Sequence, residues 1–600
     1  MNTSATTNKK VFLATTAIEE FWDKSDNNLF MGSWCFMNGK NSIAEKRSVR
    51  TLASPYVNAD LKKTYTYLNN KFEEILPIMS VTLNKIHGES YSEKYWRILI
   101  GPWLKCYIHV MFDRFSLIEK ALNDYPNFTT FLLDKDNYIT PLDTKDFSNL
   151  VASDYYNLQI FSKILKFLDK DFPEKKLKVS FNKSPIKGFK SSLKTKLLFL
   201  IQNLLIKIFS FFHNKNIYCF DSYLPRLAEI KLMLASYGKI IFVRSRVYKV
   251  NKNQIELNLN LRENLLALNF GDCLFSKCIL SLIFLEIPKV FIENYSLTKK
   301  TSFKIFPKNT AMIACSNTWF TTDVFKFWAA GKSENGVPLL GFQHGGMDYG
   351  ARECWHYRDH ETSIVDYYFS WGWKDNKCKA EIIPMPANKL INESDISSSD
   401  LETDILWVTT TKTRYLKFFP HTTSYFEKYL DYQIKFMNNI DKAYINNLKI
   451  RTNALDYGWG IKSRLKVAIK NIRFDNNNTP YYKSLKKCRL CVIDYFSTTA
   501  TEALALNKPV ILFWSKNESM NKIRVDYVKY FDLLRSVGIL YDSPEAAARA
   551  VNKVYNNVDL WWSNKKRKKA VFLFNKKFAI RSNNGLSLWK DTIIKISNSI

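Results

Sequence analysis

The sequence contains little glycine and proline, with 18 and 17 residues of each among 600. Repetitive and disordered chains need far more of both, so the composition excludes those classes. Long hydrophobic runs are also missing. Residues 197–212 are interrupted by Gln202, Asn203 and Lys207, and residues 273–284 are shorter than the roughly 20 apolar residues that span a bilayer. We therefore expect no transmembrane helix.

Paired cysteines are missing as well. The ten cysteines are scattered, and Cys488-x-x-Cys491 has no second pair to complete a zinc site. The first residues, MNTSATTNKKVFLATT, lack the apolar core of a signal peptide. We expect reduced thiols, a cytoplasmic location and no cofactor.

Acidic residues are outnumbered, 56 against 88 basic ones, which gives a formal net charge of +32. Such a surface favours anionic partners: nucleotides, acidic sugars, nucleic acid or an anionic membrane face. The abundance of Lys and Asn also fits an AT-rich genome. With 46% hydrophobic and 15% aromatic residues, a chain of this length has enough apolar material for more than one core.

One stretch, residues 339–373, combines an apolar run with polar groups suited to chemistry. The run ends in Gln343-His344-Gly345-Gly346, which predicts a buried strand that delivers a histidine onto a glycine turn at a sheet edge. Enzymes with α/β folds place their chemistry there. The same stretch carries, in addition to His344, the polar residues Arg352, Glu353, His356, Arg358, Asp359, His360, Glu361 and Asp366. A polar loop with satisfied histidines is the alternative.

Strands and helices alternate around this stretch. Strands are predicted at 216–220, 239–243 and 311–314, with a helix over 323–330 before the strand that delivers His344. This alternation predicts a parallel, doubly wound α/β sheet. Helices at 60–83 and 96–113 precede it as helical additions.

A second α/β series follows a polar stretch. Residues 392–404 offer almost nothing to a core, and strands are then predicted at 405–409, 448–451, 490–493 and 510–514. We therefore predict an N-terminal acceptor-binding and catalytic domain at 1–373, a linker at 374–404, and a C-terminal donor-binding domain with a basic tail at 405–600. The fold class is α/β, with two doubly wound Rossmann-like domains facing a crevice.

The second candidate site lies between a strand and a helix of the C-terminal series. Ser497, Thr498 and Thr499 begin the helix, and Thr499-x-x-Glu502 matches a capping box. Unpaired N–H groups and the positive end of the helix dipole suit a phosphate. Capping alone is the alternative. Arg414, on a loop after a strand, could face the same crevice or only solvent.

Two such halves predict a nucleotide-activated donor held between them. His344 can act as a base toward an acceptor hydroxyl, assisted by Gln343 and Glu353. Gly345 and Gly346 are assigned to the donor site, and Glu20, Asp221 and Arg352 to the acceptor site. Because no DxD-like pair stands at a convincing strand end, we expect the reaction to need no metal.

Residues 197–212 carry apolar side chains on nearly every face and are flanked by Lys194, Lys196 and Lys215. A basic, aromatic-rich helix of this kind can lie on an anionic membrane surface. A buried core helix is the alternative.

Several motifs resemble a bacterial family of transferases encoded in surface-polysaccharide loci. They are FLATTAIEEFWDK (12–24), MGSWC (31–35), EILPIMSVTLNKIHG (74–88), YWRILIGPWL (95–104), GFQHGG (341–346) and STTATEALALNKPVILFW (497–514). More distantly, the QHGG and DYFSTT segments are similar to the two halves of GT-B glycosyltransferases with CMP- or CDP-activated donors. That group includes Kdo, sialyl-type and polyol-phosphate transferases.

This resemblance implies a catalytic histidine at His344, a donor-phosphate site at Ser497 to Thr499 and a ribose contact at Glu502. The His-Pro motif of the sialyl-type and Kdo enzymes is absent, since the nearest match is the reversed Pro420-His421.

The implied function is transfer of a sugar, such as a nonulosonic acid or Kdo, from a CMP-linked donor to a glycan or lipid-linked glycan in capsule synthesis. Peripheral contact with the inner membrane is compatible with it. A CDP-dependent polyol-phosphate transferase is an alternative. Nucleic-acid binding is a remote one, because aromatic and basic residues are not interleaved as in RNA-binding folds.

Overall fold

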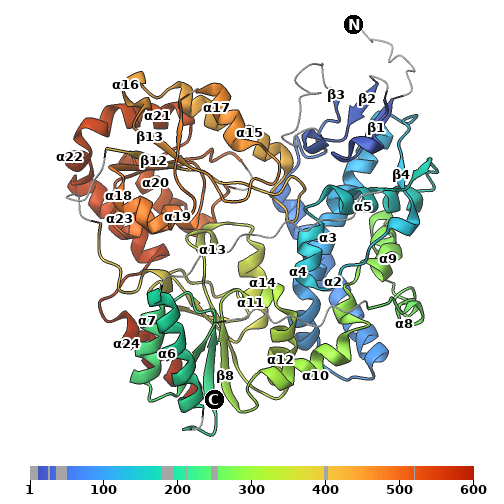
Figure 1. The fold of residues 1–600 in the computed structure, drawn as a ribbon, viewed down its shortest axis with the longest axis horizontal. Coiled ribbons are helices and arrows are strands. Elements are labelled where there is room, and N and C mark those ends of the chain that lie inside the picture. The colour runs from blue at the N-terminus through green and yellow to red at the C-terminus, as the bar shows by residue number, and fades with distance from the viewer. Residues whose placement is uncertain are drawn as a thin grey trace.

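The structure is a computed structural model that describes residues 11–24, 27–35, 50–177, 193–210, 212–244, 255–269, 271–396, 403–469, 471–518 and 521–599. Two α/β lobes, one above the other, stand beside a helical lobe at the right of Figure 1.

The lower lobe is built on a six-stranded parallel sheet. Its strands are β6 (Asn216–Phe220), β7 (Ile240–Val243), β8 (Thr310–Cys315), β9 (Leu339–Phe342), β10 (Tyr367–Ser370) and β11 (Glu381–Pro384), in the order β11-β10-β9-β8-β6-β7. The strands are apolar because helices cover the sheet, as parallel sheets require. Those helices include α6 (Leu193–Phe209), α7 (Arg226–Ala235), α10 (Tyr295–Ile305), α11 (Thr318–Thr321), α12 (Asp323–Glu334), α13 (Asp348–Ala351) and α14 (His356–Ile364).

The upper lobe repeats the plan. Its sheet contains β12 (Ile405–Val408), β13 (Leu448–Arg451), β14 (Arg473–Phe474), β15 (Leu490–Ile493), β16 (Val510–Phe513) and β17 (Leu540–Tyr541), in the order β14-β13-β12-β15-β16-β17. Its helices are α15 (Thr423–Asn438), α16 (Lys442–Ile445), α17 (Ile461–Ala468), α18 (Tyr481–Lys487), α19 (Thr498–Ala505), α20 (Val528–Ser536), α21 (Pro544–Val554), α22 (Val558–Trp562) and α23 (Lys565–Phe578). The predicted pair of doubly wound α/β sheets is confirmed.

In both sheets the strand order reverses at one point. In the lower sheet it reverses between β6 and β8, and in the upper sheet between β12 and β15. Connections leave such a switch point on opposite faces, so a crevice opens beyond the carboxyl ends of the two strands. Residues that directly follow these strands and their neighbour β9 therefore lie at the edge of the crevice.

The helical lobe contains two long helices, α2 (Leu61–His87) and α3 (Glu93–Asp124), with α4 (Thr144–Leu150), α5 (Asp154–Phe167), α8 (Leu259–Glu263) and α9 (Leu274–Glu286). Asp60 and Ser92 cap α2 and α3 by accepting first-turn N–H groups, which fixes where each helix begins. Two small sheets complete the lobe: β1 (Phe12–Ala14), β2 (Asn28–Phe30) and β3 (Arg50–Thr51); and β4 (Leu132–Leu133) with β5 (Glu174–Lys175).

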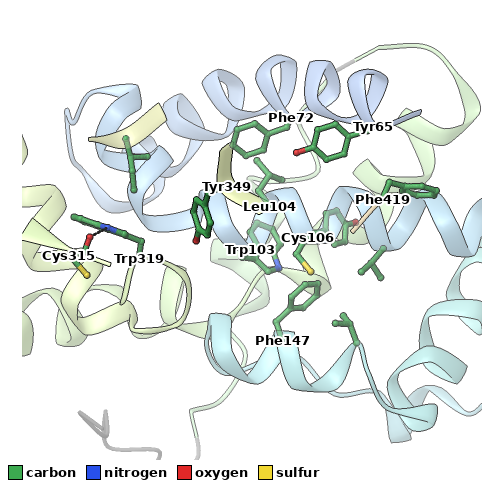
Figure 2. Close-up of a cluster of buried hydrophobic side chains, with 14 of the residues drawn as sticks. Tyr65, Phe72, Trp103, Leu104, Cys106, Phe147, Cys315, Trp319, Tyr349 and Phe419 are labelled. Carbon is green, nitrogen blue, oxygen red and sulfur yellow. Dashed lines mark hydrogen bonds between the residues drawn. The ribbon is translucent and has the colours of Figure 1, made fainter. Parts of the chain in front are cut away.

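Helix α3 joins the helical lobe to the lower sheet through a continuous hydrophobic core. Figure 2 shows Trp103, Leu104 and Cys106 of α3 among side chains from α2, α4 and α13. The Trp103 ring is fully buried, 5.4 Å from the ring of Tyr107 and 6.3 Å from that of Phe147. The helical additions are therefore part of the same core that supports the predicted catalytic stretch.

The predicted domain boundaries need correction. The predicted linker, residues 374–404, contains β11, which pairs with β10 as the last strand of the lower sheet; residues 397–402 of it lie outside the described residues. The C-terminal helix α24 (Gly585–Asn598), which was predicted to belong to the C-terminal domain, packs on the lower lobe. The Trp589 ring lies 4.9 Å from Phe342 and 5.3 Å from Phe369, on β9 and β10.

Helix α6, which covers most of residues 197–212, lies on the outside of the lower lobe (Figure 1). Leu200 is 64% exposed, so the buried-core alternative is wrong. Within the part of the chain that the structure describes, no helix has both the length and the apolar character to cross a membrane.

Candidate active site

The turn after β9 is held by Gln343. Its side-chain Nε2 donates to the carbonyls of Gly345 at 2.6 Å and Gly346 at 2.9 Å. Its Oε1 accepts from the backbone N–H of Trp371 and from Nε1 of Trp373, both at 2.8 Å. The amide of Gln343, predicted to assist catalysis, is buried and hydrogen-bonded at both its nitrogen and its oxygen, so it shapes the turn that presents His344.

His344 is half-buried and hydrogen-bonded to a buried carboxylate. Its Nε2 lies 2.9 Å from Oε1 of Glu361 and 2.5 Å from the hydroxyl of Tyr349. The other carboxylate oxygen, Oε2, accepts from Tyr368 at 2.8 Å. Among the described residues, Nδ1 of His344 has no hydrogen-bond partner. A proton on Nε2 that is donated to Glu361 would leave Nδ1 as the basic atom.

Glu361 is completely buried on α14. Burial raises the pKa of its carboxyl, and the adjacent His344, with the hydrogen bonds from that ring, Tyr368 and Tyr349, offsets only part of the rise. The buried carboxylate of Glu361 therefore fixes the orientation of the His344 ring through its contact with Nε2.

The carboxylate predicted for catalysis was that of Glu353. Its side chain pairs with Lys62 of α2 at 2.5 Å on a partly exposed surface. In the structure the carboxylate that reaches His344 is that of Glu361, while Glu353 contacts Lys62. The signal for Glu361 was available, since it lies in the same polar stretch of the sequence, but only the fold places its helix behind β9.

Residues after β6 and β8 form the side wall beside His344. The ring of Tyr223 stacks on the His344 ring, with centroids 5.7 Å apart, and its hydroxyl accepts from Asn317 at 2.8 Å. Asp221, predicted for acceptor binding, accepts from the hydroxyl of Thr318 at 2.7 Å and lies in the same wall. Asp221 and Tyr223 have φ angles of 44° and 59°, a left-handed conformation that marks a constrained turn.

The predicted phosphate site is the N-terminus of α19 in the upper lobe. Ser497 caps the helix, with its Oγ accepting from the N–H of Ala500 at 3.3 Å, and lies 2.8 Å from the Thr499 hydroxyl. In the described chain, the N–H groups of Thr498 and Thr499 have no acceptor, as expected for a first helical turn. The Thr499 hydroxyl is also 3.0 Å from that of Tyr495.

The two lobes meet where the glycine turn contacts α19. The N–H of Gly346 donates to Oγ1 of Thr498 at 3.0 Å, and the N–H of Met347 donates to Oγ1 of Thr501 at 2.9 Å. A Cβ on Gly346 would lie 2.2 Å from Oγ1 of Thr501 and 2.8 Å from Cα of Thr498. Gly346 is therefore required for this close approach, and Gly345, 3.4 Å from the Thr498 hydroxyl by the same test, lies beside it.

A small cavity lies at the same junction. It is lined by Thr410, Lys412, Tyr425, Phe426, Tyr429, Tyr495, Phe496 and Asn521 of the upper lobe and by Arg352 of the lower lobe. Burial, with the nearby positive charge of Arg352, lowers the pKa of Lys412 to about 8. In the described residues its ammonium has no hydrogen-bond partner. Lys412 was not predicted from the sequence, because nothing local distinguishes it from Arg414, which lies two residues later on the same loop.

Arg352, predicted to bind the acceptor, lies where the two lobes meet. It is buried there, with Nη2 donating to the carbonyl of Phe496 at 3.0 Å and Nε to Asp348 at 2.5 Å. Its guanidinium lies 4.4 Å from the centre of the Phe496 ring. The lower lobe thus places a cation in the wall of the junction cavity.

Arg414 and Glu20 do not take part in the site. The Arg414 guanidinium donates to the carbonyls of Trp34 and Tyr457 and pairs with Asp154, so it ties the upper lobe to the helical lobe. Glu20 is exposed in the helical lobe, where its carbonyl accepts from Lys175. The structure therefore places Arg414 between the upper and the helical lobe, and Glu20 on the helical lobe.

Glu502 lies on α19 and faces Lys389 of the lower lobe, with Oε1 and Nζ 3.9 Å apart. Burial raises the pKa of the Glu502 carboxyl, and Lys389 opposes the rise. Lys389 also lies 4.9 Å from the centre of the Tyr223 ring. This lysine, which lies in the range predicted as linker, therefore connects the wall beside His344 to α19.

Asp494 directly follows β15 at the switch point of the upper sheet. It is buried and accepts hydrogen bonds from Tyr429 at 2.8 Å, Trp407 at 3.1 Å and Gln433 at 3.2 Å. Burial raises the pKa of Asp494 to about 7. The three hydrogen bonds lower this pKa, but their effect is smaller than that of burial.

Two facing parallel sheets, one presenting a carboxylate-supported histidine and the other a helix N-terminus, form the arrangement of an α/β enzyme that works between two domains. The chain belongs to the LIC12162 family of transferases, whose family model matches residues 11–593. No curated protein matches the sequence.

Several solved structures are weakly similar. A UDP-forming α,α-trehalose-phosphate synthase from Burkholderia vietnamiensis is 10% identical, with 64% of this chain and 97% of that chain covered and a TM-score of 0.35. UDP-GlcNAc 2-epimerase from Neisseria meningitidis, bound to UDP-GlcNAc, is 11% identical, with 64% and 100% covered and a TM-score of 0.35. MurG from Acinetobacter baumannii is 10% identical, with 64% and 99% covered and a TM-score of 0.34. These scores are too low to carry a functional argument.

The raised pKa of Asp494 predicts a pH-dependent stability. Between about pH 4 and 7 the folded protein keeps a proton on this carboxyl that the unfolded chain releases, so the free energy of unfolding falls as pH rises. The slope is at most about 1.4 kcal/mol per pH unit. Asp494→Asn should remove this component when urea unfolding is compared from pH 5 to 8.

The matched control is Asp591→Asn, since the Asp591 side chain is 62% exposed. It should keep the wild-type pH dependence. An Asp494→Asn protein whose stability changes with pH as steeply as the wild type would contradict the assignment.

Proposed function

We propose that the protein is a glycosyltransferase that moves a sugar from a nucleotide-activated donor to a glycan hydroxyl. The observation that carries this proposal is the contact between the turn bearing His344 and the N-terminus of α19, where Gly346 and Thr498 are joined by a 3.0 Å hydrogen bond. A base on one lobe and an anion site on the other are then adjacent.

In the proposed reaction, Nδ1 of His344 takes the proton of the acceptor hydroxyl. The acceptor oxygen forms a bond to the anomeric carbon of the sugar, and the bond from that carbon to the phosphate oxygen breaks. The nucleotide leaves with the electron pair as a phosphate anion. Glu361 stabilises the imidazolium through Nε2.

The leaving phosphate would be stabilised by Lys412, Arg352 and the free N–H groups at the start of α19. These groups supply positive charge without a metal, and we propose a metal-independent transfer. The junction cavity has space for about one water molecule. The cavity must therefore widen before a nucleotide phosphate can reach Lys412.

The donor we propose is CMP-linked and acidic, a nonulosonic acid or Kdo, and the process is capsule or other surface-polysaccharide synthesis in the cytoplasm at the inner face of the membrane. The motifs at 341–346 and 497–514 and the net charge of +32 support this finer part. A polyol-phosphate transferase would also release CMP, but its product would contain a phosphodiester in place of a glycosidic bond.

His344→Ala should lower kcat by about 10²- to 10⁴-fold, the contribution of a positioned general base, with the donor KM little changed. Glu361→Gln should lower kcat by about 10²-fold, because the imidazolium then loses its carboxylate. Nucleotide release with a saturating donor, measured by steady-state kinetics, gives both values.

Glu353→Gln is the matched carboxylate control, since Glu353 pairs with Lys62 on the surface. It should retain wild-type kcat. Equal losses in Glu361→Gln and Glu353→Gln, or full activity in His344→Ala, would sink the assignment of the base.

The lowered pKa of Lys412 predicts a pH-dependent donor affinity. Above about pH 8 the free enzyme loses this charge, so the donor KM should rise, by roughly tenfold between pH 7 and 9 for one lost charged contact. Lys412→Met should show the raised KM throughout, and Lys412→Arg should abolish the pH dependence because arginine stays protonated.

The acceptor KM, measured in the same titration, serves as the control and should stay flat. A wild-type donor KM that is constant from pH 7 to 9, together with a normal KM in Lys412→Met, would show that this lysine does not touch the donor.

A further inference from the structure

Helix α6 exposes a row of large apolar side chains. Leu197, Leu200, Leu204 and Ile208 are 59%, 64%, 58% and 42% exposed, and their spacing places them along one side of the helix. The opposite side is anchored to the lower lobe, where the buried Gln202 donates to Glu229 and to the carbonyl of Phe242, both at 3.1 Å. The apolar row is thus a surface of the folded protein.

The neighbouring helix extends this surface. On α7, Leu227 and Leu234 are 52% and 50% exposed, and Tyr237, just after the helix, is 83% exposed. Figure 1 shows α6 and α7 together on the outer side of the lower lobe. We call the exposed apolar residues of these two helices, with Tyr237, the α6–α7 face.

Three lysines add positive charge on or beside the α6–α7 face. Lys207, Lys215 and Lys231 are exposed on or beside the two helices. The sequence of α6 contains no acidic residue. The one acidic residue of α7, Glu229, is 1% exposed and bonded to Ser222 at 2.7 Å and Arg244 at 3.0 Å. Neither helix therefore presents a carboxylate to solvent.

Exposed leucines together with lysines favour one kind of binding partner for the α6–α7 face. A second copy of the same face would bring lysines against lysines, which opposes self-association. An apolar face flanked by lysines, on two helices that expose no carboxylate of their own, is complementary to a bilayer with anionic headgroups, into which the leucines insert while the lysines meet the phosphates.

The α6–α7 face also begins beside the proposed active site. Helix α7 starts three residues after Tyr223, whose ring stacks on His344. A bilayer that covers α7 would therefore lie next to the wall of the acceptor side, within reach of a lipid-linked hydroxyl.

We infer that the α6–α7 face docks the protein on an anionic lipid bilayer. The inference deepens the proposed function by naming the partner surface, and it rests on that function only for the use of a lipid-linked acceptor. Docking itself depends on the exposed leucines and lysines alone.

Vesicle sedimentation tests the inference with the full chain. Wild-type protein should sediment with vesicles of phosphatidylcholine mixed with phosphatidylglycerol, and less with phosphatidylcholine alone. The double variant Leu200→Gln/Leu204→Gln should bind the mixed vesicles at least about tenfold more weakly, because two inserting side chains become polar. Lys207→Glu/Lys231→Glu should lose the preference for phosphatidylglycerol.

Leu560→Gln is the matched control, since Leu560 is 76% exposed on α22 of the other lobe, and it should bind as the wild type does. Wild-type protein that stays in the supernatant, or a leucine double variant that sediments normally, would overturn the inference. So would a concentration-dependent dimer, seen by sedimentation velocity, that the leucine substitutions abolish.

Turnover with a water-soluble acceptor separates this inference from the proposed function. Both double variants should keep wild-type turnover in that assay, because α6 and α7 carry none of the proposed catalytic groups. Loss of vesicle binding by wild type with turnover intact would refute docking alone. Vesicle binding without any transfer activity would refute the function and leave docking in place.

Discussion

The contact between the glycine turn after β9 and the first turn of α19 is the constraint on which the proposed site depends. Two backbone N–H groups, of Gly346 and Met347, donate to the hydroxyls of Thr498 and Thr501. Only a residue without a side chain allows the backbone to come so close. This seam places a histidine from one sheet beside the helix dipole of the other.

Buried polar groups hold the glycine turn and His344 in place. The side-chain amide of Gln343 donates to the glycine turn and accepts hydrogen bonds from Trp371 and Trp373, which follow β10. Glu361 receives His344 and Tyr368 in a fully buried position, which is tolerable because both carboxylate oxygens are hydrogen-bonded. Helix α3 packs behind them as part of the same core. The geometry of His344 is therefore set by the whole lower half of the molecule.

Much of the fold could be predicted from local patterns. Apolar runs bounded by turn residues identified β6, β9, β13 and β15, because such strands are buried on both faces and carry a strong signal. The pairing of His344 with the region of Ser497 to Thr499 followed from where parallel strands end. The boundaries between domains were harder to predict, because β11 has the sequence Glu-Ile-Ile-Pro and lacks a continuous apolar run, so only its pairing with β10 marks it as a strand of the lower sheet.

The side-chain roles were harder to predict than the positions. Arg414 and Lys412 lie on one loop, and nothing in the sequence shows that Asp154, far away in the chain, captures the arginine while the lysine faces the cavity. The same holds for Glu353 and Glu361, because only tertiary packing decides which of the two carboxylates contacts His344. Long-range contacts of this kind are not encoded in local spacing.

The most direct measurement is a thermal-shift panel of the protein with CMP, CDP, UDP, GDP and their sugar conjugates. A ligand at about 100 times its Kd adds roughly 2.7 kcal/mol to the stability of the folded state, which such a scan detects. We predict selective stabilisation by CMP and CMP-linked acidic sugars, reduced in Lys412→Met. Selective stabilisation by UDP or GDP would contradict the proposed donor, and the absence of stabilisation by every nucleotide would contradict a donor site between the two lobes.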